Sequence, residues 1–236
     1  LQFLGFVAMM IFGVAASKFP GCLGFRAADS GWGLAAFGLW SSGLIARVVG
    51  WNVYFQSGLM PGTDLWFRLG GVLLALGAGA MTLSLGVFSP VRHANPSQKF
   101  IRSAFAWLLI AGALLILEPL HLRAIGAPFS HAYTGAIRHA VTVGFISQMI
   151  VAVGYHLVTK MLMLDERTVP ALWSVFVLLN VGNAARVGLE IITDVNRSAF
   201  APMGWTGFVE LLGLGIWATV MLRFLLRRSQ TYATSC

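Results

Sequence analysis

Seven long apolar runs recur along this chain, and they restrict its fold more than any other feature. Each is close to 20 residues, long enough to cross about 30 Å of hydrocarbon. Because lipid offers no hydrogen-bonding partner, the backbone there must form helices or a closed barrel. The runs are continuous rather than alternating, which excludes the barrel. We predict an all-α transmembrane fold of about seven helices, with spans at 1–17, 33–54, 66–88, 100–118, 134–158, 171–192 and 205–226.

Proline-containing segments are predicted to separate these spans, because proline lacks a backbone N–H and restricts the residue before it. The predicted boundaries are Lys18–Gly21, Met60–Gly62, Ser89-Pro90, Glu118-Pro119 and Ala201-Pro202.

The charge distribution is typical of a membrane protein. Only 10% of the residues are charged, against about 25% in a soluble domain. The net charge of +8 comes from residues scattered at span ends, which excludes a nucleic-acid-binding patch and leaves the lipid bilayer as the expected partner. The more basic end should be cytoplasmic, together with the C-terminus. That end carries Lys18, Arg26, Arg92, Lys99, Arg102, Lys160, Arg167, Arg223, Arg227 and Arg228, and the other carries Arg68, Arg123, Arg138 and Arg197.

An internal repeat lies beneath the hydrophobic pattern. Residues 5–50 align without a gap on residues 144–189, at a separation of 139 positions. The sequence Ala46-Arg47-Val48 then falls on Ala185-Arg186-Val187. Hydrophobic similarity alone would not place an intramembrane arginine at the same offset.

The repeat predicts units of four helices, related by an axis near the membrane normal, because an even number of spans keeps successive units parallel. Residues 1–88 would hold the last three helices of one unit. Residues 89–236 would hold a complete unit and a cytoplasmic C-terminal tail. Leu1 lies inside an apolar run, so we expect further residues before it, with a histidine at the position equivalent to His139.

Four histidines are candidate metal ligands. His139 begins an apolar helix near the outer face, where an imidazole could bind haem iron or copper, or instead bond to a neighbouring carbonyl. His121 and His131 precede it and could add to a metal site, although loop histidines are common. His156 lies about 25 Å further along the same helix, so it would serve a second, inner cofactor or act as an interfacial residue.

Arg47 and Arg186 are charges deep within predicted spans, where an unpaired charge is costly. Arg186 could pair with Glu190, one turn further on, or with Glu210 at a similar depth. Either arginine could instead hold an anionic group such as a haem propionate, and Arg47 could take a partner from the other unit.

Other polar and small residues are predicted to join helices. Asn180, Asn183 and Gln148 suit interhelical hydrogen bonds, and the glycine-rich run Gly70–Ala80 suits close helix packing.

The stretch His139-Ala140-Val141-Thr142-Val143-Gly144, with Met149-Ile150 downstream, resembles the histidine-led helix of the NnrS family. The stretches Met10–Val14 and Phe19–Gly24 are similar to that family too. The resemblance implies a haem- and copper-containing membrane protein of twelve helices, similar in architecture to haem–copper oxidase subunit I and linked to nitric oxide response. This chain would be its C-terminal seven helices, in a bacterial inner (cytoplasmic) membrane. His139 would then be a haem ligand, and Arg186 would meet the propionates.

Departures from the oxidase pattern argue against a catalytic haem–copper centre. The span 33–54 contains no histidine, and a His-x-His pair is absent at His139. We therefore expect a single haem, used in nitric oxide response or electron transport, and the sequence leaves enzymatic activity open. The alternatives are a non-catalytic structural or assembly subunit, bound to other membrane subunits, and a transporter.

Overall fold

The computed structural model describes residues 2–60, 62–91, 95–164 and 169–233, without the side chains of 227–233. These residues form helices and no strand, as predicted, and seven helical stretches are long and apolar enough to span a membrane. The elements are η1 (Gln2–Val7), α1 (Ala8–Cys22), α2 (Ser30–Gln56), α3 (Leu65–Leu85), α4 (Gln98–Ile125), α5 (His131–His139), η2 (Ala140–Ser147), α6 (Gln148–Met161), α7 (Trp173–Thr193), η3 (Arg197–Ala199) and α8 (Phe200–Ala233).

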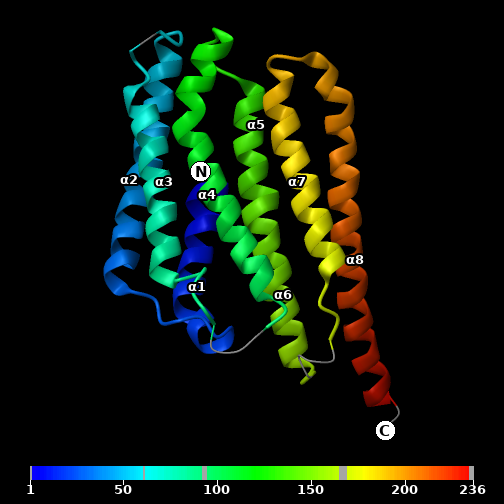
Figure 1. Cartoon of the computed structure of the whole chain (residues 1–236). Helices are drawn as coiled ribbons and strands as arrows, with labels where there is room; N and C mark the ends of the chain where they lie inside the picture. Colours follow the sequence, from blue (N-terminus) through cyan, green and yellow to red (C-terminus); the bar gives the residue numbers. More distant parts are fainter. Residues whose placement is uncertain (1, 61, 92–94, 165–168, 234–236) are drawn as a thin grey trace.

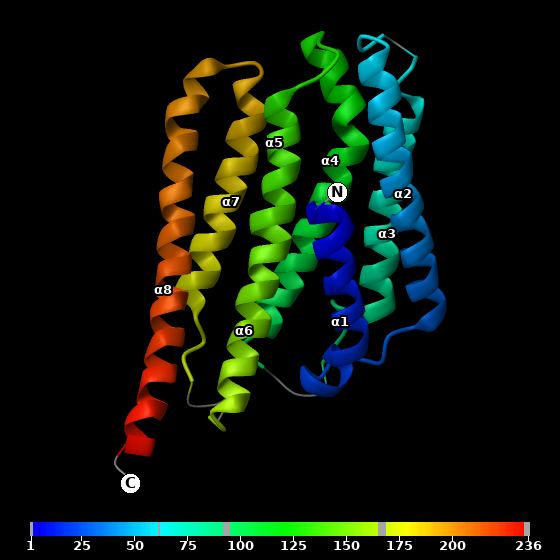
Figure 2. The same cartoon turned by 180° about the vertical axis from the view of Figure 1, so that it is seen from behind.

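The helices form one bundle of roughly parallel and antiparallel elements (Figure 1). The pair α2 and α3 lies at one side, the pair α7 and α8 at the other, and α4 and α5–η2–α6 fill the centre. Seen from behind, α1 lies between α6 and the α2–α3 pair (Figure 2). Aromatic contacts join these central helices: the Phe12 ring lies 5.0 Å from Trp40 and 6.1 Å from Phe145, which lies 5.6 Å from Phe105.

Two predicted boundaries are wrong, because proline lies inside a helix there. Pro20 lies within α1 and Pro119 within α4. Pro202 lies in the first turn of α8, where its missing N–H has no intrahelical acceptor to lose. The Ser89-Pro90 boundary follows the end of α3 and is confirmed, whereas Pro61 lies outside the described residues. Neighbouring helices and local adjustment tolerate intramembrane proline.

Glycines set the spacing between α2 and α3, as the glycine-rich run predicts. A Cβ atom on Gly70 would lie 2.5 Å from the Arg47 nitrogen, and one on Gly77 would lie 3.0 Å from the Trp40 nitrogen. On the facing helix, a Cβ atom on Gly50 would lie 2.2 Å from the Phe67 nitrogen. The two backbones therefore approach closely enough for van der Waals packing to hold them in lipid.

Two local features recur at the separation of 139. The span that contains His139 and the first span of the chain, η1–α1, each contain a π-helical segment. Adding 139 to the bounds of η1 gives 141–146, which lies inside η2. Gly43 packs against the backbone at Gly70 and Leu74, and Gly182 packs against Val209 and Glu210. These features support the predicted repeat, and the division at residues 88 and 89 stays a prediction.

The predicted basic end is one end of the bundle. The ends of α1, α3, α6 and α8 meet the starts of α2, α4 and α7 there (Figure 1). Arg92 and Arg167 lie outside the described residues, as do the side chains of Arg227 and Arg228. We call this end the basic end and the opposite one the outer end.

Candidate functional site

His139 lies at the junction where α5 passes into η2, a π-helical segment of one continuous span. π-Helical turns are rare and often occur at functional sites. A Cβ atom on Gly144 would lie 2.5 Å from Trp107 of α4 and 2.8 Å from Asn183 of α7. The wide turn thus fits between α4 and α7 because residue 144 has no side chain.

Glu190 joins the two site residues that the sequence singled out. Its Oε1 atom lies 3.6 Å from His139 Nε2, and it accepts a hydrogen bond of 3.2 Å from Arg186 Nε. Arg186 also donates to the Met203 carbonyl at 3.1 Å. Of the two partners predicted for Arg186, Glu190 is therefore the one that forms the ion pair.

Glu210 of α8 completes this group of charges. Its side chain is buried, with 9% of the residue exposed. It packs closely against Gly182 of α7, where an added Cβ atom would lie 2.8 Å from the Glu210 Cγ atom. Glu210 is in electrostatic range of Arg186 and Glu190. The Arg186 guanidinium is therefore paired with one carboxyl group and lies within electrostatic range of a second. We call His139, Asn183, Arg186, Glu190 and Glu210 the outer polar cluster.

Several buried atoms of the outer polar cluster have no hydrogen-bond partner among the described residues. They are His139 Nδ1, Asn183 Oδ1 and Nδ2, Glu190 Oε2 and Glu210 Oε1. Buried polar atoms are normally paired, so a concentration of unpaired ones points to bound water, an ion or a ligand. The expectation that Asn183 joins helices is wrong, since neither of its amide atoms has a hydrogen-bond partner in the part of the chain that the structure describes.

A second polar group lies deeper, about one turn of α7 from Asn183, and its members are hydrogen-bonded to one another. Asn180 Oδ1 accepts from Ser103 at 2.5 Å, from Trp107 Nε1 at 2.9 Å and from Gln148 Nε2 at 3.1 Å. These bonds join α4, α6 and α7. They confirm the interhelical role predicted for Asn180 and Gln148, and they hold the helices that position the outer polar cluster.

His121 and His131 lie apart from His139. His121 Nε2 lies 2.7 Å from Asp194 Oδ2, which also accepts from Ser130 at 2.6 Å, and the His121 ring stacks on Tyr133 at 4.4 Å. His131 is exposed, with its ring 4.8 Å from that of Phe129. His121 therefore ties α4 to the ends of α5 and α7.

His156 lies near the basic end, buried, with Nδ1 at 3.3 Å from Asn95 Nδ2. The structure therefore does not bring the four predicted histidines together. Within the described ranges, no group of three or more His, Cys, Asp or Glu side chains could hold a metal ion.

Arg47 takes its partner from the other predicted unit. Its Nη2 atom donates to Glu118 of α4 at 2.7 Å, and its guanidinium lies 3.9 Å above the Phe67 ring. The sequence places Glu118 at the last position of the span 100–118 and does not single it out as the partner of Arg47. The sequence does carry a signal for this pair, because Glu118 is an acidic residue at the end of an apolar run. If the helix extends past it, its carboxylate lies within the span and needs a partner.

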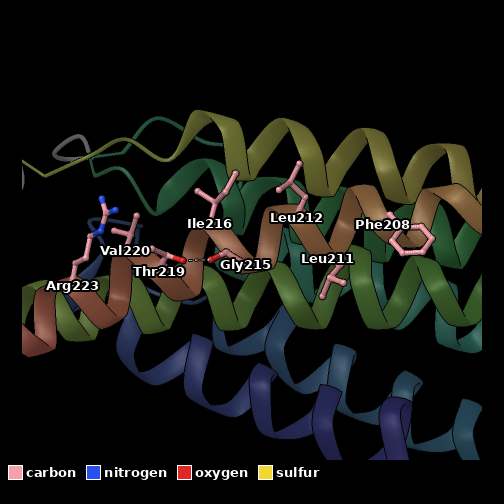
Figure 3. Close-up of a pocket in the computed structure, with 8 residues that line it drawn as sticks. All are labelled: Phe208, Leu211, Leu212, Gly215, Ile216, Thr219, Val220 and Arg223. Atoms are coloured by element: carbon pink, nitrogen blue, oxygen red, sulfur yellow. Dashed lines mark hydrogen bonds between the residues drawn. The ribbon is translucent and has the colours of Figure 1, made fainter.

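The outward face of α8 carries a shallow groove of about 700 Å³ (Figure 3). Phe208 and Leu212 are exposed along it, Arg223 lies at the basic end, and Thr219 bonds to Gly215 within the helix at 2.8 Å. The lining is largely apolar, which suits lipid acyl chains.

No protein family, curated protein or solved structure matches this chain. The function must therefore be inferred from the residues of the site.

Proposed function

We propose that this protein is a multi-pass membrane protein of NnrS-like type, in which His139 is an axial ligand of haem. Its role would lie in nitric oxide response or electron handling. The observation that supports this proposal is the buried Nδ1 atom of His139, which has no partner among the described residues. Imidazole nitrogen is a common axial ligand of haem iron.

The surroundings of His139 suit a metal-binding imidazole. The Glu190 carboxylate lies 3.6 Å from Nε2, and a carboxylate beside the other ring nitrogen fixes the orientation and tautomer of a ligating histidine. Arg186 holds Glu190 in place through their ion pair. When bound, haem iron would supply electron transfer and a position for a diatomic ligand.

The remaining residues fit haem less completely. Arg186 and Arg47 already have carboxylate partners, so each guanidinium is an occupied rather than a free site for a propionate. His139 lines neither the groove on α8 nor the cavity bordered by Arg47 and Arg138. This chain therefore offers a ligand and its supporting residues.

An absorbance spectrum of the purified protein, oxidised and reduced, tests the proposal. We expect a haem Soret band that is lost or shifted in His139→Ala and retained in His131→Ala, an exposed imidazole at the same end. Circular dichroism of both variants would show that each is folded. A spectrum unchanged by His139→Ala would remove His139 from the ligand set. Absence of haem, together with a stable copurifying partner, would instead favour a structural subunit.

A second candidate, a proton- or cation-coupled transporter, is favoured by Glu190 and Glu210. Each carries a buried carboxylate oxygen without a partner, and buried intramembrane acids commonly mark proton relays and ion pathways. Proton movement in proteoliposomes would test it. Loss in Glu190→Gln and Glu210→Gln, with no haem in the preparation, would favour transport.

We further propose that the basic end faces the cytoplasm of a bacterial inner membrane. The basic residues around α1, α3 and α6 support this orientation through the positive-inside rule. Reporter domains fused at the C-terminus should be active only if they function in the cytoplasm. Activity of a periplasm-specific reporter there would reverse the topology.

A further inference from the structure

A cavity of about 170 Å³ lies between η1, α2, α4 and the α5–η2 span, away from His139. Arg47 and Arg138 reach it from different helices, and its walls are otherwise largely apolar, including Leu4, Leu115 and Val141. Thr134 and Thr142 also line it, but both hydroxyls donate to backbone carbonyls of their own helix. Arg47 and Arg138 are therefore the charged residues of its lining.

The two arginines differ in their charge balance. Arg47 is paired with Glu118 at 2.7 Å, so the pair contributes little net charge. Arg138 is exposed, and among the described residues its guanidinium forms no hydrogen bond or ion pair. The cavity is therefore lined by one guanidinium outside any ion pair of the described residues, although Glu190 lies within its electrostatic range, and such a group suits a singly charged anion.

The depth of Arg138 indicates where that anion comes from. The span His131–Met161 has 31 residues, or about 46 Å, and exceeds the roughly 30 Å hydrocarbon layer by about 8 Å at each end if centred. Arg138 lies seven positions, or about 10 Å, from the outer start of this span. Its side chain can therefore reach the level where lipid phosphates meet the hydrocarbon.

We propose that this cavity binds the headgroup phosphate of an anionic phospholipid from the outer leaflet. Arg138 bonds the phosphate, and the apolar walls contact the acyl chains. A guanidinium matches the geometry of a phosphate group, and amphipathic walls distinguish a lipid from a free anion. The proposal is independent of the haem site, since His139 does not line the cavity.

Binding of phosphatidylglycerol, phosphatidylcholine and inorganic phosphate to the purified full chain in detergent tests the proposal. Native mass spectrometry would measure lipid occupancy, and thermal unfolding would follow all three ligands. We expect occupancy and a raised Tm with phosphatidylglycerol, and weaker effects with phosphatidylcholine or phosphate. Arg138→Gln should lower the phosphatidylglycerol affinity about fivefold, the effect of one basic residue near a membrane surface.

Arg197→Gln is the matched control, because Arg197 is exposed at the same end and lies outside the cavity. It should leave the affinity unchanged. Equal losses in both variants would show non-specific attraction and overturn the proposal, as would wild-type affinity in Arg138→Gln. Inorganic phosphate acting as strongly as phosphatidylglycerol would replace the lipid with a free anion.

Discussion

Arg47 of α2 and Glu118 of α4 form an ion pair at 2.7 Å, although they stand 71 positions apart in the chain. Both are largely buried, with side chains 15% and 6% exposed. The pair therefore joins the two predicted repeat units inside the membrane and satisfies a charge that neither residue could carry alone.

We expect Glu118→Ala to destabilise the protein by about 3–5 kcal/mol, because it leaves the Arg47 guanidinium buried without its carboxylate. Equilibrium unfolding in detergent micelles would measure the change. In a double-mutant cycle, Arg47→Met should recover part of the loss, since the uncompensated charge is then removed. Additive effects of the two substitutions would contradict a direct pair.

Gly70→Ala should destabilise the contact between α2 and α3, because the new Cβ atom would lie 2.5 Å from the Arg47 nitrogen. Overpacking of this kind typically costs about 1–3 kcal/mol. Gly79→Ala, on the same helix with no atom within 4 Å, is the matched control and should leave stability unchanged or raise it slightly. Thermal unfolding of both variants measures the difference, and equal Tm values would argue against the close approach.

Glu210→Met should make the protein more stable by about 1–3 kcal/mol, because it removes a buried carboxylate oxygen that lacks a hydrogen-bond partner. Glu118→Met should instead lower the stability of the protein, since the Glu118 carboxylate is paired with Arg47. Unfolding curves of both variants, recorded under the same conditions, would show whether the free energy of unfolding rises in one and falls in the other. A loss of stability in Glu210→Met would indicate that Glu210 is bonded in the folded protein.

His121→Ala should lower stability by about 1–3 kcal/mol, through loss of its contacts with Asp194 and the Tyr133 ring. His131→Ala removes an exposed imidazole and should change stability by less than about 0.5 kcal/mol. Chemical unfolding monitored by tryptophan fluorescence compares the two. A large effect at His131 would reveal a structural or metal-binding role that its exposure does not suggest.

The fold was predictable from hydrophobicity, but the helix ends were not. Pro20 and Pro119 interrupt the sequence pattern without interrupting α1 and α4, because packing against neighbouring helices compensates for a lost backbone bond. The sequence also pointed to Arg186 and His139, since ionisable residues in apolar spans are conspicuous. It could not show that Glu190 lies between them, or that Asn183 would be buried without a partner.

Hydrophobic length and composition by themselves determined that this chain forms about seven helices suited to a membrane, because a backbone in lipid has few ways to satisfy its hydrogen bonds. Only the tertiary structure decided which charges meet. Glu118 faces Arg47, and Arg138 faces a cavity, because helices distant in the sequence pack side by side. Such pairings depend on how each helix is rotated about its own axis and on which helices are its neighbours. Local sequence patterns do not encode either of these directly.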